Sequence, residues 1–253
     1  MKKIALVTGA TSGIGKATAV MLADCGFNLI ITGRRDERLN ELKSELKIKY
    51  KAESLSLCFD VCKKDEVCAA IESIPERWQN IDVLINNAGL AVGLNHIQDG
   101  IFDDWDRMVD TNVKGLLYVT RCVAPLMIAG NKGHIVNIGS VAGKDVYENG
   151  NVYCATKHAV DALSKAMRID MLKHNIKVTN VCPGFAETEF SIVRFKNDLE
   201  RAKAVYSGMI PLTSEDIANV IRFVINLPPH VCINDIVVTP TSQANAFIIN
   251  RNT

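Results

Sequence analysis

A tyrosine and a lysine four residues apart are the residues of this sequence best suited to proton transfer. Tyr153 and Lys157 fall within 151–174, which has the pattern of a helix, so both side chains are expected on one helix face. A free tyrosine has a pKa of about 10, and a nearby cation lowers it by favouring the phenolate. Ser140 follows the apolar segment 135–138, and its hydroxyl could bind a substrate oxygen while Tyr153 transfers the proton. Taken alone, the pair is equally typical of an ordinary helix face, and Ser140 of a turn.

A glycine-rich turn near the N-terminus has the composition of a phosphate-binding loop. Residues 8–15 read Thr-Gly-Ala-Thr-Ser-Gly-Ile-Gly and join a short apolar segment to a helical pattern. Glycine permits a tight turn and close approach of the backbone to a pyrophosphate, which would rest at the helix N-terminus. A plain turn is the alternative, but the place after a first strand favours dinucleotide binding. The expected contacts are Gly9, Thr11, Ser12, Gly13, Ile14 and Gly15.

The end of the second apolar segment indicates which dinucleotide is bound. A fold that prefers NAD usually has Asp or Glu there, to hold the ribose 2′-hydroxyl. This chain has Gly33 followed by Arg34 and Arg35. Two guanidinium groups and no carboxylate suit a 2′-phosphate, so NADP (NADPH) is expected to be preferred over NAD. The alternative is that both arginines are solvated loop charges.

The elements that would position these residues alternate between strand and helix throughout residues 1–253. This alternation predicts a single domain with an α/β Rossmann fold, a doubly wound parallel sheet of about seven strands with helices on both faces. The expected strands are 3–8, 27–32, 54–59, 82–86, 135–138, 177–181 and 235–239. Helical patterns occupy 14–25, 39–50, 63–78 (disturbed by Pro75), 103–130, 151–174 and 213–227, the last with Thr213 and Asp216 as a capping pair.

Two segments interrupt this alternation after the carboxyl ends of strands, where open α/β sheets bind ligands. The first, 90–100, is a polar loop, and the second, 185–209, mixes charged residues with aromatic ones and is expected to form a substrate lid. Arg194 and Lys196 lie in this lid. Both could bind a carboxylate of the substrate, Arg194 by a bidentate pair, and the alternative is that both are solvated on a mobile lid.

Taken together, these features resemble the short-chain dehydrogenase/reductase family. Further matches are Asp60-Val61, Asn86-Asn87-Ala88-Gly89, Asn112 and Pro183-Gly184, each in the expected order. The resemblance implies a catalytic tetrad of Asn112, Ser140, Tyr153 and Lys157, in which Asn112 helps hold a water beside Lys157 and Lys157 also holds the cofactor's ribose. It also implies that Asp60 and Val61 border the adenine, that Asn87, Ala88 and Gly89 line the ribose region, and that Pro183, Gly184 and Thr188 face the nicotinamide.

A narrower resemblance rests on Thr32-Gly33-Arg34-Arg35, on 188–196 and on Pro240-Thr241-x-Gln243. These segments are similar to the NADP-dependent 3-hydroxy acid dehydrogenases, which include enzymes that act on serine and allo-threonine. The resemblance implies hydride transfer between NADP and a small 3-hydroxy acid or its semialdehyde or keto form, with Ser140, Tyr153 and Arg194 at the substrate. It also implies a homotetramer that pairs the helices beginning near Asp103 and Asn151 and the C-terminal strand, to which the apolar segment 244–249 could contribute.

The composition of the chain restricts the partners, metal sites and functional classes that remain. The net charge of +1 favours no nucleic-acid or membrane partner, and no apolar run reaches the length of a membrane span. Eight scattered cysteines and five histidines without metal-ligand spacing predict no metal site, and reduced thiols indicate a cytoplasmic protein. Two alternatives stay open: a reductase of neutral ketones or β-ketoacyl groups, and a non-catalytic dinucleotide sensor. Such a sensor would tend to lack the tetrad, which is complete here.

Overall fold

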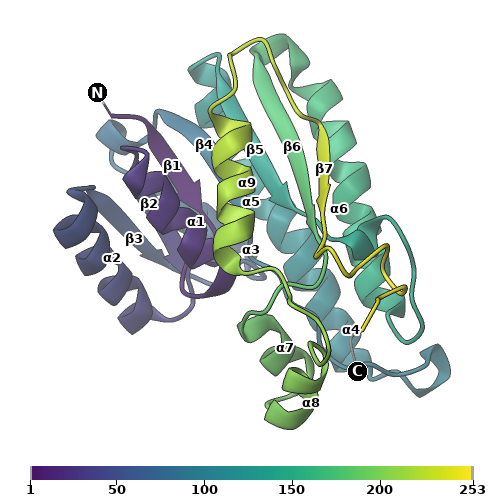
Figure 1. Cartoon of the computed structure of the whole chain (residues 1–253). Coiled ribbons are helices and arrows are strands. Elements are labelled where there is room, and N and C mark those ends of the chain that lie inside the picture. The colour runs from purple at the N-terminus through teal and green to yellow at the C-terminus, as the bar shows by residue number, and fades with distance from the viewer. Residues whose placement is uncertain (1, 252–253) are drawn as a thin grey trace.

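The computed structural model describes residues 2–251, which form a seven-stranded parallel sheet with the strand order β3-β2-β1-β4-β5-β6-β7. The strands are β1 (Ile4–Val7), β2 (Asn28–Gly33), β3 (Ser54–Cys58), β4 (Ile81–Asn86), β5 (Gly133–Ile138), β6 (Ile176–Pro183) and β7 (Asp235–Val238). Strand order reverses beside β1, because β2 lies on one side of it and β4 on the other. The expected doubly wound fold is confirmed (Figure 1).

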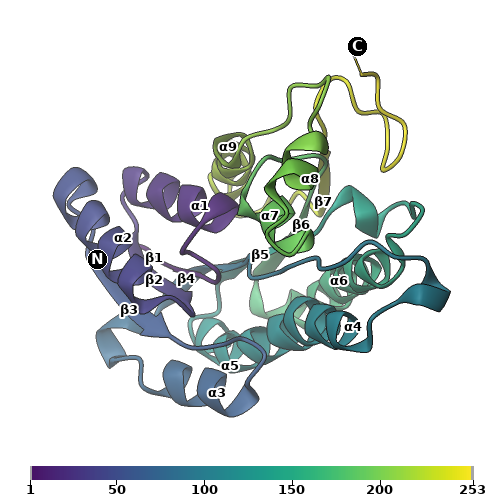
Figure 2. The same cartoon turned by 90° about the horizontal axis from the view of Figure 1, so that it is seen from below.

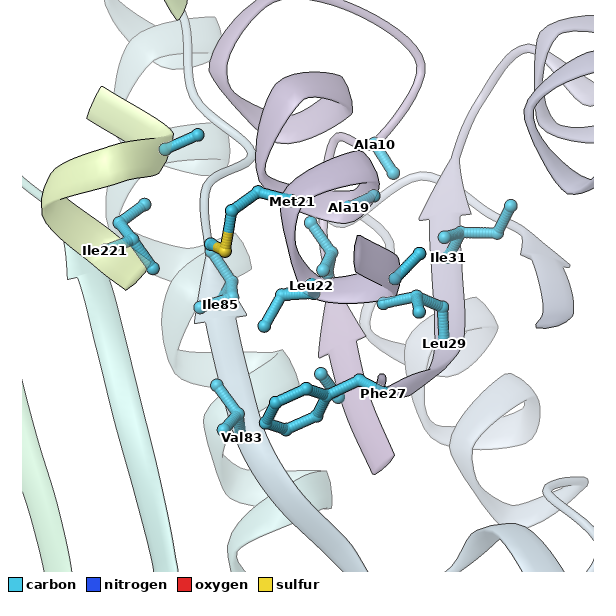
Figure 3. Close-up of a cluster of buried hydrophobic side chains, with 14 of the residues drawn as sticks. Ala10, Ala19, Met21, Leu22, Phe27, Leu29, Ile31, Val83, Ile85 and Ile221 are labelled. Atoms are coloured by element: carbon cyan, nitrogen blue, oxygen red, sulfur yellow. The ribbon is translucent and has the colours of Figure 1, made fainter. Parts of the chain in front are cut away.

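Helices cover both faces of the sheet (Figure 2). One face carries α1 (Gly13–Asp24), α2 (Asp36–Tyr50) and α9 (Ser214–Ile225), and the other carries α3 (Lys64–Glu72), α4 (Phe102–Val109), α5 (Leu116–Ala129) and α6 (Asn151–Asp170). The five central strands, β1, β2, β4, β5 and β6, are mostly buried, which explains their largely apolar sequences, whereas the edge strands β3 and β7 are partly exposed. Figure 3 shows the core of the first face, where Met21 and Leu22 of α1 meet Ile85 of β4 and Ile221 of α9.

Three expected helices are shorter or less regular than the sequence predicted. The segment 103–130 is divided into α4, a π-helical segment (Asp110–Gly115) and α5, and at Gly115 an added Cβ would lie 2.8 Å from Val61. The segment 63–78 ends as a helix at Glu72, and a separate 3-10 turn (Glu76–Trp78) follows Pro75. Helix α6 ends at Asp170 and is followed by a 3-10 turn (Leu172–His174).

The lid segment contains two helices that the sequence did not predict, α7 (Glu189–Arg194) and α8 (Leu199–Ala204). Each has six residues, too few to produce a hydrophobic periodicity. Each is capped by its own sequence, because the side chains of Thr188 and Asp198 accept hydrogen bonds from backbone N–H groups of the first turn. Figure 1 shows both helices beyond the end of the sheet, below α9, whose expected capping pair of Thr213 and Asp216 is confirmed.

A buried histidine on β5 should make the fold sensitive to acid. His134 lies against Thr179, with 2.8 Å between Nε2 and Oγ1, and its burial, aided by the charge of Lys177, lowers its pKa to about 3. At a pH below about 6.5, the pKa of histidine in the unfolded chain, the unfolded chain binds a proton at His134 that the native protein does not bind. The free energy of unfolding therefore decreases as the pH is lowered. We expect the wild type to lose about 2 kcal/mol more than His134→Gln between about pH 7 and pH 5. Urea unfolding at both pH values measures this, and equal losses in the two proteins would contradict it.

Candidate active site

A cavity of about 610 Å³ lies at the carboxyl ends of the strands and extends from the glycine turn to the lid. Among the residues predicted for the site, Gly15, Asn112 and Lys196 are outside its lining, and all the others line it. Gly15 instead packs against the turn, because an added Cβ would lie 2.3 Å from the carbonyl oxygen of Gly9. The fold therefore brings together residues that are separated by more than 180 positions in the chain.

The glycine turn has the geometry of an anion site. Gly9 and Gly13 have φ angles of +64° and +52°, a region that side chains with a Cβ rarely adopt. Helix α1 begins at Gly13, and its N-cap residue Ser12 makes no side-chain capping bond. The N–H groups of the first turn are thus not satisfied by a cap and suit a pyrophosphate. Thr188 faces this turn, 3.4 Å from where a Cβ on Gly13 would lie.

Three arginines gather at the end of β2. Arg34 pairs with Asp60 at 3.3 Å, and Arg35 donates to the hydroxyls of Thr11 and Ser12. The third, Arg38, lies in the first turn of α2 and pairs with Glu189. Sequence reasoning missed Arg38. A signal was present, because residues four positions apart share one side of a helix, and Arg38 follows Arg34 by four residues at the start of α2.

Ser140, Tyr153 and Lys157 meet in the cavity as expected. Tyr153 and Lys157 are 8% and 7% exposed, and the lysine Nζ lies 6.0 Å from the centre of the tyrosine ring. Lys157 donates a hydrogen bond of 2.8 Å to the carbonyl oxygen of Ile138, at the end of β5. Ser140 accepts a hydrogen bond from the N–H of Ala142, which fixes its hydroxyl at the same edge.

Burial governs the charges of this pair in the protein alone. Burial and the neighbouring Tyr147 raise the pKa of Tyr153, and the Ser140 hydroxyl and the Arg194 charge oppose this only in part. Burial also lowers the pKa of Lys157 to about 8. The sequence predicted a lowered tyrosine pKa, so this expectation is not met by the protein on its own. Burial therefore keeps the Tyr153 phenol neutral, whereas Lys157, with a pKa of about 8, is still mainly an ammonium at neutral pH, and each charged form would be stabilised by the opposite charge on the other.

Asn112 lies behind the cavity, in the π-helical segment between α4 and α5. Its side-chain amide exchanges two hydrogen bonds of 2.8 Å with the backbone of Leu90 and donates a third to Thr156 of α6. Asn112 thereby joins the loop after β4 to the helix that carries Tyr153 and Lys157. Irregular π turns are often found at functional sites, where they redirect a backbone.

Arg194 of α7 lines the cavity, whereas Lys196 does not. The Arg194 guanidinium lies over the rings of Tyr147 and Tyr153, 5.4 and 5.7 Å from their centres, and donates to the Tyr147 hydroxyl at 2.9 Å. Its buried Nε has no hydrogen-bond partner among residues 2–251. Lys196 instead pairs with the buried Asp104 at 2.8 Å, which ties the lid to α4. Sequence reasoning missed Tyr147, which no local pattern distinguishes.

The arrangement of this site agrees with a comparison against protein families. Residues 3–198 match the model of the family described as short chain dehydrogenase. The chain belongs to this family. The expected family and enzyme class are therefore confirmed, and the matched region includes the glycine turn, the arginines and all four residues of the tetrad.

Individual relatives within this family indicate which members the chain is similar to. An NADP-dependent 3-hydroxy acid dehydrogenase from Schizosaccharomyces pombe is 43% identical over 250 residues, covering 98% of this chain and 96% of the relative. Sulfoacetaldehyde reductase 2 from Chromohalobacter salexigens is also 43% identical and is covered over its full length, as is this chain. The closed form of a serine dehydrogenase complexed with NADP+ superimposes with a TM-score of 0.91 at 42% identity, covering 99% of this chain and all of that one. These names agree with the expected cofactor and the expected subgroup.

Residues 2–251 contain neither a metal-binding cluster nor a membrane-spanning helix. No group of three or more His, Cys, Asp or Glu side chains in this range could hold a metal ion. No helix in this range combines the length and apolar character that crossing a membrane requires.

Proposed function

We propose that this protein is an NADP-dependent dehydrogenase that interconverts a small 3-hydroxy acid and its semialdehyde or keto form. The observation that carries this proposal is the position of Arg194. Its guanidinium lies beside the ring of Tyr153, and its Nε atom is buried and has no hydrogen-bond partner among residues 2–251. A buried donor on a cation is costly to leave unpaired, and a substrate carboxylate would satisfy it.

The proposed chemistry assigns one task to each residue of the cavity. When bound, NADP supplies the acceptor or donor of the hydride. During oxidation, the Tyr153 oxygen takes the proton of the substrate hydroxyl, and during reduction it returns the proton to the carbonyl oxygen. Ser140 donates a hydrogen bond to that substrate oxygen. Lys157, in its ammonium form, stabilises the phenolate, and Asn112 keeps the surrounding loop and helix in place and helps to hold a water beside Lys157.

The assignment of NADP to this chain rests on the end of β2. The glycine turn suits a pyrophosphate. Asp60, Val61, Arg34 and Arg35 line the cavity beside it, and we assign the first two to the adenine and the two arginines to the 2′-phosphate. Asn87, Ala88, Gly89, Pro183, Gly184 and Thr188 also line the cavity. We assign the first three to the ribose region and the last three to the nicotinamide. The kcat/KM ratio of NADPH over NADH should fall in Arg34→Ala, because one guanidinium is lost from the phosphate site.

A second candidate is the reduction of an aldehyde that carries a sulfonate. Sulfoacetaldehyde reductase 2 resembles this chain over its whole length, and a sulfonate presents the same negative charge and acceptor oxygens as a carboxylate. Neutral ketones and β-ketoacyl groups are a less favoured class, because they would leave the buried Nε of Arg194 unsatisfied.

A substrate panel tests these proposals directly. We expect NADP reduction with L-serine, L-allo-threonine or 3-hydroxypropionate at a kcat/KM at least about tenfold above that of 1,3-propanediol, since a hydrogen-bonded charge pair is worth at least that much. NADPH oxidation with sulfoacetaldehyde belongs in the same panel. A higher kcat/KM for neutral alcohols or ketones than for every anionic compound would refute an anionic substrate.

We further propose a cytoplasmic homotetramer. All eight cysteines are free thiols, which suits a reducing compartment. Several large apolar side chains are exposed on the helices expected at subunit contacts and on the C-terminal segment: Phe102 on α4, Leu117 on α5, Ile169 on α6, and Phe247 and Ile248. Sedimentation of the purified protein tests the oligomeric state.

A further inference from the structure

A carboxylate from the lid is bound by two of the three arginines at the end of β2. Glu189 is the first residue of α7, and its oxygens accept hydrogen bonds from Arg35 at 3.0 Å and from Arg38 at 2.8 and 3.1 Å. These partners are more than 150 positions apart in the chain. The ion pairs therefore connect the lid, which carries Arg194, to the adenosine end of the cavity.

The same contacts occupy the donors that a 2′-phosphate would need. Nη1 of Arg35 is bonded to Glu189, and its other nitrogens are bonded to Thr11 and Ser12. Arg34 is paired with Asp60. In the protein alone, each guanidinium of this group thus has an internal acceptor.

A purely structural role explains Glu189 poorly. Its side chain and those of Arg35 and Arg38 are 42–44% exposed, and exposed ion pairs contribute little to stability. Partial burial raises the pKa of Glu189, but the hydrogen bonds from Arg35 and Arg38 outweigh this effect and lower it, so the carboxylate is charged at neutral pH. Glu189 and Arg35 both line the cavity. A carboxylate and a phosphate monoester are acceptors of the same kind for guanidinium donors.

We propose that Glu189 is a specificity-determining residue whose carboxylate competes with the 2′-phosphate of NADP for Arg35 and Arg38 and is displaced when the phosphate binds. This inference rests on the proposed binding of NADP by Arg35. The exchange breaks the contact between α7 and the arginines, so the lid responds to a cofactor with a 2′-phosphate. NAD has no such group and leaves the contact in place. The bound phosphate competes with an internal anion, which lowers the affinity for NADP below what the arginines alone would give.

Binding of two nucleotides without a nicotinamide tests this exchange separately from catalysis. We expect Glu189→Gln to bind 2′,5′-ADP about three- to tenfold more tightly than the wild type does, since two half-exposed ion pairs no longer compete. Binding of 5′-ADP should be unchanged, and isothermal titration calorimetry measures both. Glu187→Gln is the matched control, because Glu187 is exposed in the same segment and its carboxylate accepts no hydrogen bond from an arginine among residues 2–251. Equal or weaker binding of 2′,5′-ADP by Glu189→Gln would overturn the proposal.

Hydrogen exchange of the lid gives a second and independent readout. Amides of 189–204 should exchange faster with saturating 2′,5′-ADP than with 5′-ADP in the wild type, and at equal rates in Glu189→Gln. The same rates in the wild type with both nucleotides would contradict release of the lid. The variant Arg35→Gln tests the proposed NADP site separately from the role of Glu189. If this variant keeps the wild-type ratio of the affinities for 2′,5′-ADP and 5′-ADP, Arg35 does not bind the 2′-phosphate and the proposed cofactor site is wrong.

Discussion

Tyr153→Phe is expected to lower kcat by about 10²- to 10⁴-fold, the usual contribution of a positioned acid–base group. The variant keeps the ring that packs against Phe190 and lies beside Arg194, so the cavity should retain its shape. It lacks the oxygen that exchanges a proton with the substrate. The dissociation constant of NADPH should change by less than about twofold, because the proposed cofactor contacts are made mainly by other residues.

Two measurements separate a chemical role of Tyr153 from a structural one. Steady-state kinetics with 3-hydroxypropionate and NADP gives kcat, and quenching of protein fluorescence by NADPH gives the affinity for the cofactor. Tyr147→Phe is a useful contrast, because Tyr147 is a second, partly buried phenol that lines the same cavity and accepts a hydrogen bond from Arg194. We expect that variant mainly to raise KM. Turnover of Tyr153→Phe at the wild-type rate would remove Tyr153 from the mechanism.

The parts of this protein that could be predicted from the sequence are those with a local physical cause. The strands were predicted to within two residues at each end, because buried parallel strands are short, continuous apolar runs. The glycine turn could also be predicted from a local cause, because Gly9 and Gly13 adopt positive φ angles that favour glycine. Tyr153 and Lys157 share a helix face because four residues make about one turn.

The parts that could not be predicted depend on contacts between distant segments. The long helix at 103–130 is interrupted where Asn112 bonds to Leu90 and Gly115 packs against Val61, and neither contact leaves a local pattern. Arg38 and Glu189 are ordinary helix residues until the fold places them together. The pKa of Tyr153 differs from the expected direction because the sequence reveals the neighbouring charge but not the depth of burial.

Arg194→Met is expected to raise KM for 3-hydroxypropionate by about 10- to 100-fold, the range that corresponds to losing hydrogen bonds to a charged group. The methionine side chain retains apolar contact with the rings of Tyr147 and Tyr153 but presents no donor to a carboxylate. The neutral analogue 1,3-propanediol has the same chain length and loses no ion pair. Its KM should change by less than about threefold, because surface and packing changes of this kind are small.

The ratio between the two substrates matters more than either value alone. The Arg194 charge also lowers the pKa of Tyr153, so its removal should slow proton transfer from any alcohol to the phenolate. That effect is common to the acid and the diol and cancels in the ratio of their kcat/KM values. Lys196→Met is the matched control, because this lid cation contacts Asp104 outside the cavity and should affect both substrates equally. An unchanged ratio in Arg194→Met would show that the guanidinium acts on Tyr153 or on the lid, and that the substrate carboxylate is bound elsewhere.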